Sequence, residues 1–78
     1  MKERYEREYK IIGLNIAYYR KLRNMTQQEL ARAANISRTH ISNIESPNMP
    51  TSVSLETLMD IAWILDVPVT QILTFDKR

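Results

Sequence analysis

Residues 25–45 read MTQQELARAANISRTHISNIE, and this stretch decides the fold. Thr26 and Glu29 form a capping box, in which the Thr hydroxyl accepts the free N–H of the third helical residue and the Glu carboxylate accepts the N–H of the cap. The box therefore predicts a short helix that begins at Gln27 and runs to about residue 34.

A second short helix follows after a turn of three residues, Asn-Ile-Ser at 35–37. Ser37 is a preferred N-cap residue, and the predicted helix over 38–45 ends before Pro47 because proline disfavours the helical conformation in its predecessor. Such a turn is too short for antiparallel packing, so the two helices meet at a wide angle. This arrangement is the helix-turn-helix, whose second helix lies in the major groove of DNA.

Apolar spacing predicts further helices on both sides of this pair. The helix before Asn24 presents Ile12, Ile16 and Tyr19 on one face. A later helix, capped by Ser54 and ended by Val67-Pro68, carries an apolar stripe, and a last short turn follows over 69–73. The stripe consists of Leu55, Leu58, Ala62 and Leu65. No segment alternates apolar and polar residues as a strand does. We therefore predict an all-α, compact five-helix bundle.

The chain has 78 residues, 44% of them hydrophobic and none of them Cys, which allows one domain. We divide it into a charged N-terminal extension over residues 1–10 and a DNA-binding domain over residues 11–78. A single His without Cys argues against a zinc site. No stretch approaches the ~20 apolar residues of a membrane span, and the charged N-terminus does not resemble a signal peptide. A cytoplasmic location is therefore expected.

Nothing in the residue types indicates an enzyme or a cofactor. There is no Cys nucleophile or Gly-rich phosphate loop, and His40 has no evident triad partner. The acidic residues also lack metal-ligand spacing. The chain is too short for a separate sensing domain, so we expect no small-molecule effector.

The net charge of +2 conceals an asymmetry along the chain. Residues 10–44 carry six basic residues and one acidic residue, whereas residues 46–78 carry two basic and four acidic ones. This distribution favours one half that faces a polyanion and another that faces protein. An ordinary solvated surface with accidental clustering is the alternative.

The chain resembles the Cro/repressor-type (Xre-like) helix-turn-helix family of phage repressors and small bacterial regulators, whose DNA-binding domains are of the lambda-repressor-like type. The motifs that carry the resemblance are Ile12-Gly13, Tyr19-Arg20, TQQELA at 26–31, ISRTHISNIE at 36–45, LETL at 55–58 and Ile61-Ala62. The similarity extends over roughly residues 11–73. It implies sequence-specific binding of double-stranded DNA, with the recognition helix at about 38–45.

The resemblance also implies roles for single residues. The positions that face base edges are Arg38, Thr39, Ser42 and Asn43. Those that contact or orient phosphate are Gln27, Gln28, Ser37 and Asn48. Arg20 and Glu45 match an ion pair that joins the first helix to the end of the recognition helix. The chemistry agrees, because Arg can form a bidentate contact with guanine and Asn with adenine.

The segment after the recognition helix departs from the family pattern. Relatives usually carry Gly and then Lys or Arg there, whereas this chain has Ser-Pro-Asn-Met-Pro at 46–50. Lys10, Lys21 and Arg23 are the candidates to supply the missing positive charge, but spacing alone does not show which face they occupy.

One recognition helix reads few base pairs, so relatives mostly dimerise and bind half-sites about 34 Å apart. Trp63 lies opposite the apolar stripe and, with Val67, Pro68 and Val69, predicts a homodimer contact on a two-fold symmetric operator. The alternative is that the segment around Tyr5 and Tyr9 covers Trp63.

The leading hypothesis is a small dimeric transcriptional regulator that acts as a repressor. A restriction–modification controller protein is the alternative within this class. An antitoxin or adaptor that uses the same fold to bind protein is the alternative from another class, and the uncharged segment mildly favours it.

Overall fold

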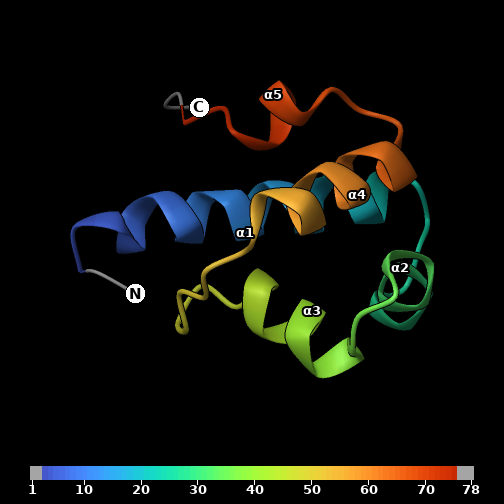
Figure 1. The fold of residues 1–78 in the computed structure, drawn as a ribbon, viewed down its shortest axis with the longest axis horizontal. Helices are drawn as coiled ribbons and strands as arrows, with labels where there is room; N and C mark the ends of the chain where they lie inside the picture. Colours follow the sequence, from blue (N-terminus) through green and yellow to red (C-terminus); the bar gives the residue numbers. More distant parts are fainter. Residues whose placement is uncertain (1–2, 76–78) are drawn as a thin grey trace.

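The computed structural model describes residues 3–75, which form one 3-10 turn and five α-helices (Figure 1). In chain order the elements are η1 (Glu3–Tyr5), α1 (Glu6–Leu22), α2 (Gln27–Ala34), α3 (Arg38–Glu45), α4 (Leu55–Leu65) and α5 (Val69–Ile72). Across residues 3–75 there is no strand. The predicted all-α five-helix fold is confirmed, and α2 and α3 have the predicted bounds.

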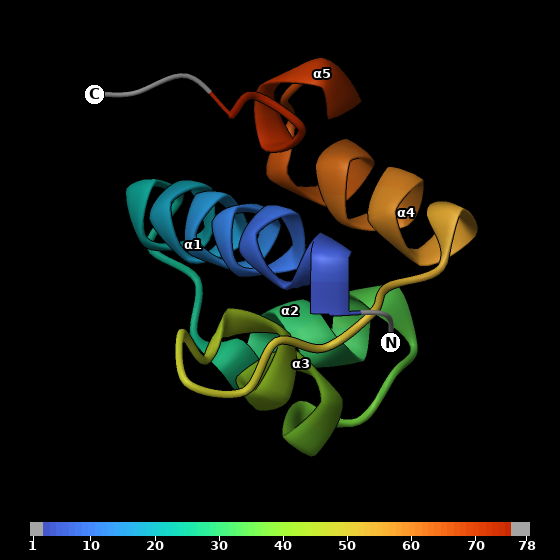
Figure 2. The same ribbon diagram turned by 90° about the vertical axis from the view of Figure 1, so that its left-hand side faces the viewer.

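Helix α1 is the longest element, and it packs against α3, α4 and α5. In Figure 2 α1 and α4 lie next to each other, with α2 and α3 on one side of them and α5 on the other. Residues 6–10, which we predict to belong to an N-terminal extension, form the first turns of α1. Among the helices of residues 3–75, none has the length and apolar character needed to cross a membrane.

Three predicted N-caps form as local hydrogen bonds. The Thr26 hydroxyl accepts the Glu29 N–H at 3.0 Å, and the Glu29 carboxylate accepts the Thr26 N–H at 2.8 Å. The Ser37 hydroxyl accepts the His40 N–H at 3.0 Å and so starts α3. The Ser54 hydroxyl likewise accepts an N–H in the first turn of α4.

Helices α1, α2 and α4 end at or next to a left-handed residue that is not glycine. Asn24, Asn35 and Asp66 have φ values of 58°, 58° and 59°. The two Asn residues stand where Gly is common at helix ends, since Asn tolerates this conformation well. The left-handed Asp66 is not predicted from the sequence, because Val67-Pro68 already accounts for the end of α4.

The core is built from one face of every α-helix. Its fully buried large side chains are Ile16, Leu30, Ile41, Ile44, Ile61, Leu65 and Ile72. The prediction that Leu55 belongs to the buried stripe of α4 is wrong, because this residue is 64% exposed. The buried arc of α4 is centred on Leu58, Ile61 and Leu65, and at 100° per residue Leu55 falls at its edge beside the exposed Met59.

Two residues of α1 bring distant elements close together. The side-chain amide of Asn15 is buried and donates to the carbonyl oxygens of Ile72 at 2.9 Å and Thr74 at 3.0 Å, so α1 holds the end of α5. Gly13 lies against the backbone of Ile44, where an added Cβ would collide with the carbonyl oxygen. This glycine therefore permits the close approach of α1 and α3.

Candidate nucleic-acid interface

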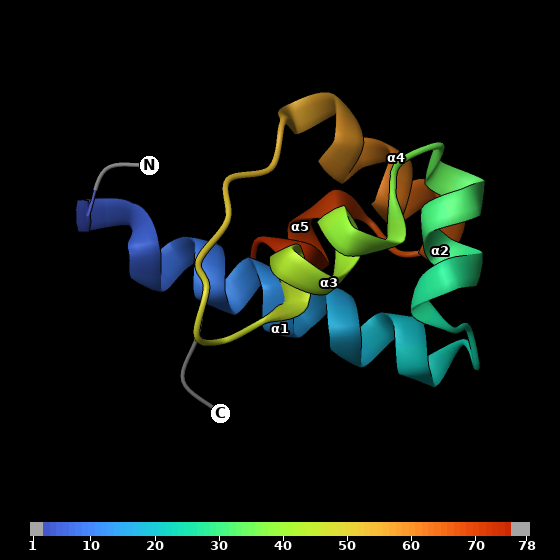
Figure 3. The same ribbon diagram turned by 90° about the horizontal axis from the view of Figure 1, so that it is seen from below.

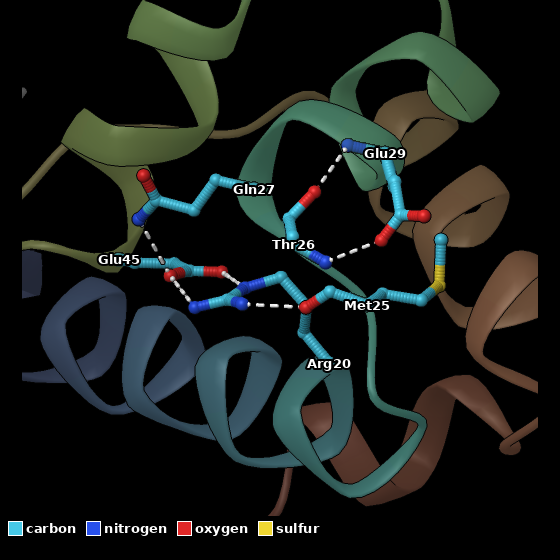
Figure 4. Close-up of polar contacts among 6 residues, drawn as sticks. All are labelled: Arg20, Met25, Thr26, Gln27, Glu29 and Glu45. Atoms are coloured by element: carbon cyan, nitrogen blue, oxygen red, sulfur yellow. Dashed lines mark hydrogen bonds and ion pairs between the residues drawn. The ribbon is translucent and has the colours of Figure 1, made fainter.

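The recognition helix α3 is fixed at its C-terminal end by an ion pair with α1 (Figure 4). The Arg20 guanidinium donates from Nε to one Glu45 carboxylate oxygen at 2.7 Å and from Nη2 to the other at 3.0 Å. Both side chains are almost wholly buried. Two parallel bonds of this kind fix the relative orientation of the two groups as well as their distance.

The same cluster includes the start of α2. Arg20 Nη1 donates to the Met25 carbonyl oxygen at 2.7 Å, and Gln27 Nε2 donates to Glu45 Oε1 at 3.0 Å. Figure 4 shows these side chains converging just before the capping box of α2. One carboxylate thus joins α1, α2 and α3, and this sets the angle between the two helices of the pair.

The four residues expected to face bases lie on the solvent side of α3. Arg38 and Thr39 are exposed and Ser42 and Asn43 are half-buried. Ile41 and Ile44 of the same helix point into the core. The first N–H groups of a helix have no acceptor within it and face outward, so this end of α3 presents donors, a guanidinium and a hydroxyl together.

The residues expected to contact phosphate divide into two kinds. Gln28 and Asn48 are exposed. The Gln27 amide is bonded to Glu45, and the Ser37 hydroxyl accepts an N–H of α3. The Gln27 amide therefore links α2 to the end of the recognition helix, and its phosphate contact stays a prediction.

The predicted dimer residues lie at the end of α4 and just beyond it. Trp63 is 83% exposed, and it lines one hollow together with Val67 and Pro68. Val69 is half-buried against the core. The alternative in which Tyr5 and Tyr9 cover Trp63 is wrong, because these two tyrosines line a different hollow, beside Leu55 and Leu58.

Three cations have positions that spacing alone does not reveal. Arg23 donates to the carbonyl oxygens of Leu65 at 2.7 Å and Asp66 at 3.2 Å, so it caps α4. Arg7, for which the sequence predicts no role, lies with Lys10 beside the segment that follows α3. Their i, i+3 spacing places them on one face, but this signal is informative only once α1 is known to begin at Glu6.

A short helix pair joined by a three-residue turn, with polar side chains on the outer face of its second helix, defines the helix-turn-helix class of DNA-binding domain. A family model described as helix-turn-helix matches residues 16–72. The chain belongs to this family, as the resemblance of its motifs implies.

Two curated relatives are regulators. Control protein C.SmaI of Serratia marcescens is 33% identical over 64 residues, which are 82% of this chain and 74% of the relative. The transcriptional regulator SinR of Bacillus subtilis is 35% identical over 63 residues, or 81% of this chain, and the match spans only 56% of SinR.

A solved structure agrees with both the fold and the family. The crystal structure of SinR, described as the master regulator for biofilm formation, in complex with DNA superimposes with a TM-score of 0.74. The two chains are 35% identical, and the match covers 81% of this chain and 98% of the SinR chain in that structure.

Proposed function

We propose that this protein binds double-stranded DNA in a sequence-specific manner and regulates transcription, as a repressor. The observation that carries the proposal is the ion-pair cluster of Arg20, Gln27 and Glu45, which holds α3 so that its polar face points outward. In this role Arg38 and Asn43 read bases from the major groove, Thr39 and Ser42 support them, and the start of α2 lies against phosphate.

The test is selection of bound DNA from a random double-stranded pool, followed by sequencing of the bound fraction. A protein that reads bases yields a consensus with several strongly preferred positions, because each good side-chain contact discriminates by about 1–3 kcal/mol. A bound pool with no enrichment would contradict the proposal. Repression is tested separately, with a reporter gene whose promoter overlaps the selected site.

We propose further that two copies bind a two-fold symmetric operator through a contact built on Trp63, Val67, Pro68 and Val69. The support is the large exposed indole beside a hollow that Val67, Pro68 and Asp66 also line, in the acidic half of the chain. An inverted-repeat consensus is the expected result, and half-sites centred about one helical turn apart would match the dimer geometry. A consensus with a single half-site would contradict the dimeric reading.

The similarity to control protein C.SmaI supports a second candidate, a restriction–modification controller. The two candidates share the same DNA-binding chemistry and differ in the genes that flank the operator. Locating the selected consensus in the source genome separates them, because a controller's site lies beside restriction and modification genes.

The protein-interaction alternative predicts different behaviour in salt. A DNA reader that neutralises several phosphates loses affinity steeply as salt rises, with a slope of about −0.9 per phosphate on logarithmic axes. An antitoxin or adaptor without strong DNA reading shows no such high-affinity, salt-dependent binding.

As a bacterial or phage regulator, the protein would act in the cytoplasm.

A further inference from the structure

An open hollow separates the first turns of α1 from the segment that joins α3 to α4. Its lining residues are Glu6, Arg7, Lys10, Pro47, Asn48 and Pro50. Figure 3, which views the molecule from the side of α3, shows this yellow segment crossing the blue N-terminal half of α1. Residues about 40 positions apart in the sequence thus form one surface next to the recognition helix.

The two cations of this surface are available to a ligand. Arg7 and Lys10 are both exposed, and among the side chains described for residues 4–75 neither has an ion-pair partner. Their spacing of three residues places both on one side of α1. Glu6 is the one acidic residue in the lining, so the hollow has a net positive charge.

The segment opposite these cations is uncharged but polar. Residues 46–50 contain no Lys or Arg, and Asn48 offers an exposed amide. Because this segment directly follows α3, a DNA strand that flanks the groove occupied by α3 passes close to it. A strand there meets no positive charge from the segment itself, so any charged contact must come from a neighbouring element.

We propose that Arg7 and Lys10 bind a backbone phosphate of the DNA at this hollow, so that α1 supplies the cations that the α3–α4 segment lacks. This inference rests on the proposed DNA-binding function and adds a phosphate site to it. The other cations considered do not fit as well. Arg23 is bonded to the end of α4, and Lys21 lies about 16 Å from Lys10 along the axis of α1.

The contact carries no sequence information, since every nucleotide presents the same phosphate. Removal of the contact should therefore make binding less dependent on salt and leave the base preference unchanged. We would measure the affinity for a duplex carrying the selected consensus, by fluorescence anisotropy, over a series of KCl concentrations. The variants are the double substitution Arg7→Gln/Lys10→Gln and, as a matched control on the same helix, Lys21→Gln.

We expect the double variant to lower the salt slope by about 1–2 and to weaken consensus and mismatched duplexes by the same factor. Lys21→Gln should leave the slope nearly unchanged, and Glu6→Gln should tighten binding slightly. We expect α1 to stay intact in each variant, because Gln is a good helix former. Circular dichroism checks this expectation.

Two outcomes would overturn the phosphate site. The first is a double variant whose salt slope equals that of the wild type. The second is a Lys21→Gln variant that loses as much slope and affinity as the double variant, which would indicate that the net charge of the protein, and not a local contact, determines the effect. Both differ from failure of the proposed function, in which the wild-type protein itself shows no salt-dependent binding to the duplex.

Discussion

Arg20 Nε donates to Glu45 Oε2 at 2.7 Å and thereby joins the C-terminal half of α1 to the last residue of the recognition helix. The carboxylate also accepts from Gln27 at the start of α2. Because both charged side chains are nearly inaccessible to water, each depends on the other for compensation of its charge. The orientation of α3 therefore rests on one buried ion pair.

We expect Arg20→Ala to lower the free energy of unfolding by about 3–5 kcal/mol, because it leaves the Glu45 carboxylate buried without its cation. Such a loss is a large part of the stability of a domain of this size. Urea unfolding followed by circular dichroism measures it. Gln27→Ala removes only one of the bonds to Glu45 and should cost roughly 1–2 kcal/mol. Equal stability of Arg20→Ala and the wild type would refute this account of the pair.

Arg38→Ala should weaken binding to the selected consensus by about 1–3 kcal/mol and relax the preference at one base pair. The unfolding midpoint should not change, since Arg38 is exposed and no hydrogen bond from its side chain is present within residues 3–75. The matched control is Arg32→Ala, which also removes an exposed arginine side chain, but from α2. If both variants lose affinity equally and keep every base preference, Arg38 does not read a base.

Trp63→Ala should weaken self-association by about 2 kcal/mol or more, because large aromatic side chains dominate the energy of such contacts. The monomer should keep its stability, as 83% of this residue is already exposed. Sedimentation equilibrium over a range of protein concentrations measures the effect. Tyr18→Ala is the control, because it removes another exposed aromatic ring, from α1. A wild-type protein that stays monomeric both with and without operator DNA would contradict the dimer contact.

Gly13→Ala should destabilise the fold, although this substitution in the middle of a helix normally stabilises it by roughly 0.5–1 kcal/mol. The added Cβ meets the backbone of Ile44, which cannot move without separating α1 from α3. Overpacking of this kind costs about 1–3 kcal/mol, so the thermal midpoint should fall by several degrees. Ala17→Gly on the same helix should cost only about 1 kcal/mol. A raised midpoint for Gly13→Ala would show that α1 and α3 are not in close contact.

Much of this fold was predictable from the sequence because hydrogen bonds between residues close in the chain set the starts of its helices. Thr26, Ser37 and Ser54 each bond to an N–H three residues ahead. Such a bond depends only on residue type and spacing within one turn. The left-handed conformation of Asn35 was predictable in the same way, because the tolerance of Asn for it depends on residue type. The face of α3 that carries the candidate base-contacting residues was also predictable, since the three- and four-residue spacing of apolar residues in a helix fixes which side faces outward.

The tertiary structure alone decided the contacts between elements far apart in the chain. Sequence spacing did not reveal that Asn15 holds the end of α5, that Arg23 caps α4, or that Leu55 lies outside the core. It also did not place Arg7 and Lys10 beside the segment after α3. A cap is determined within one turn of backbone, whereas these contacts exist only after several helices have packed together and set the distances between them.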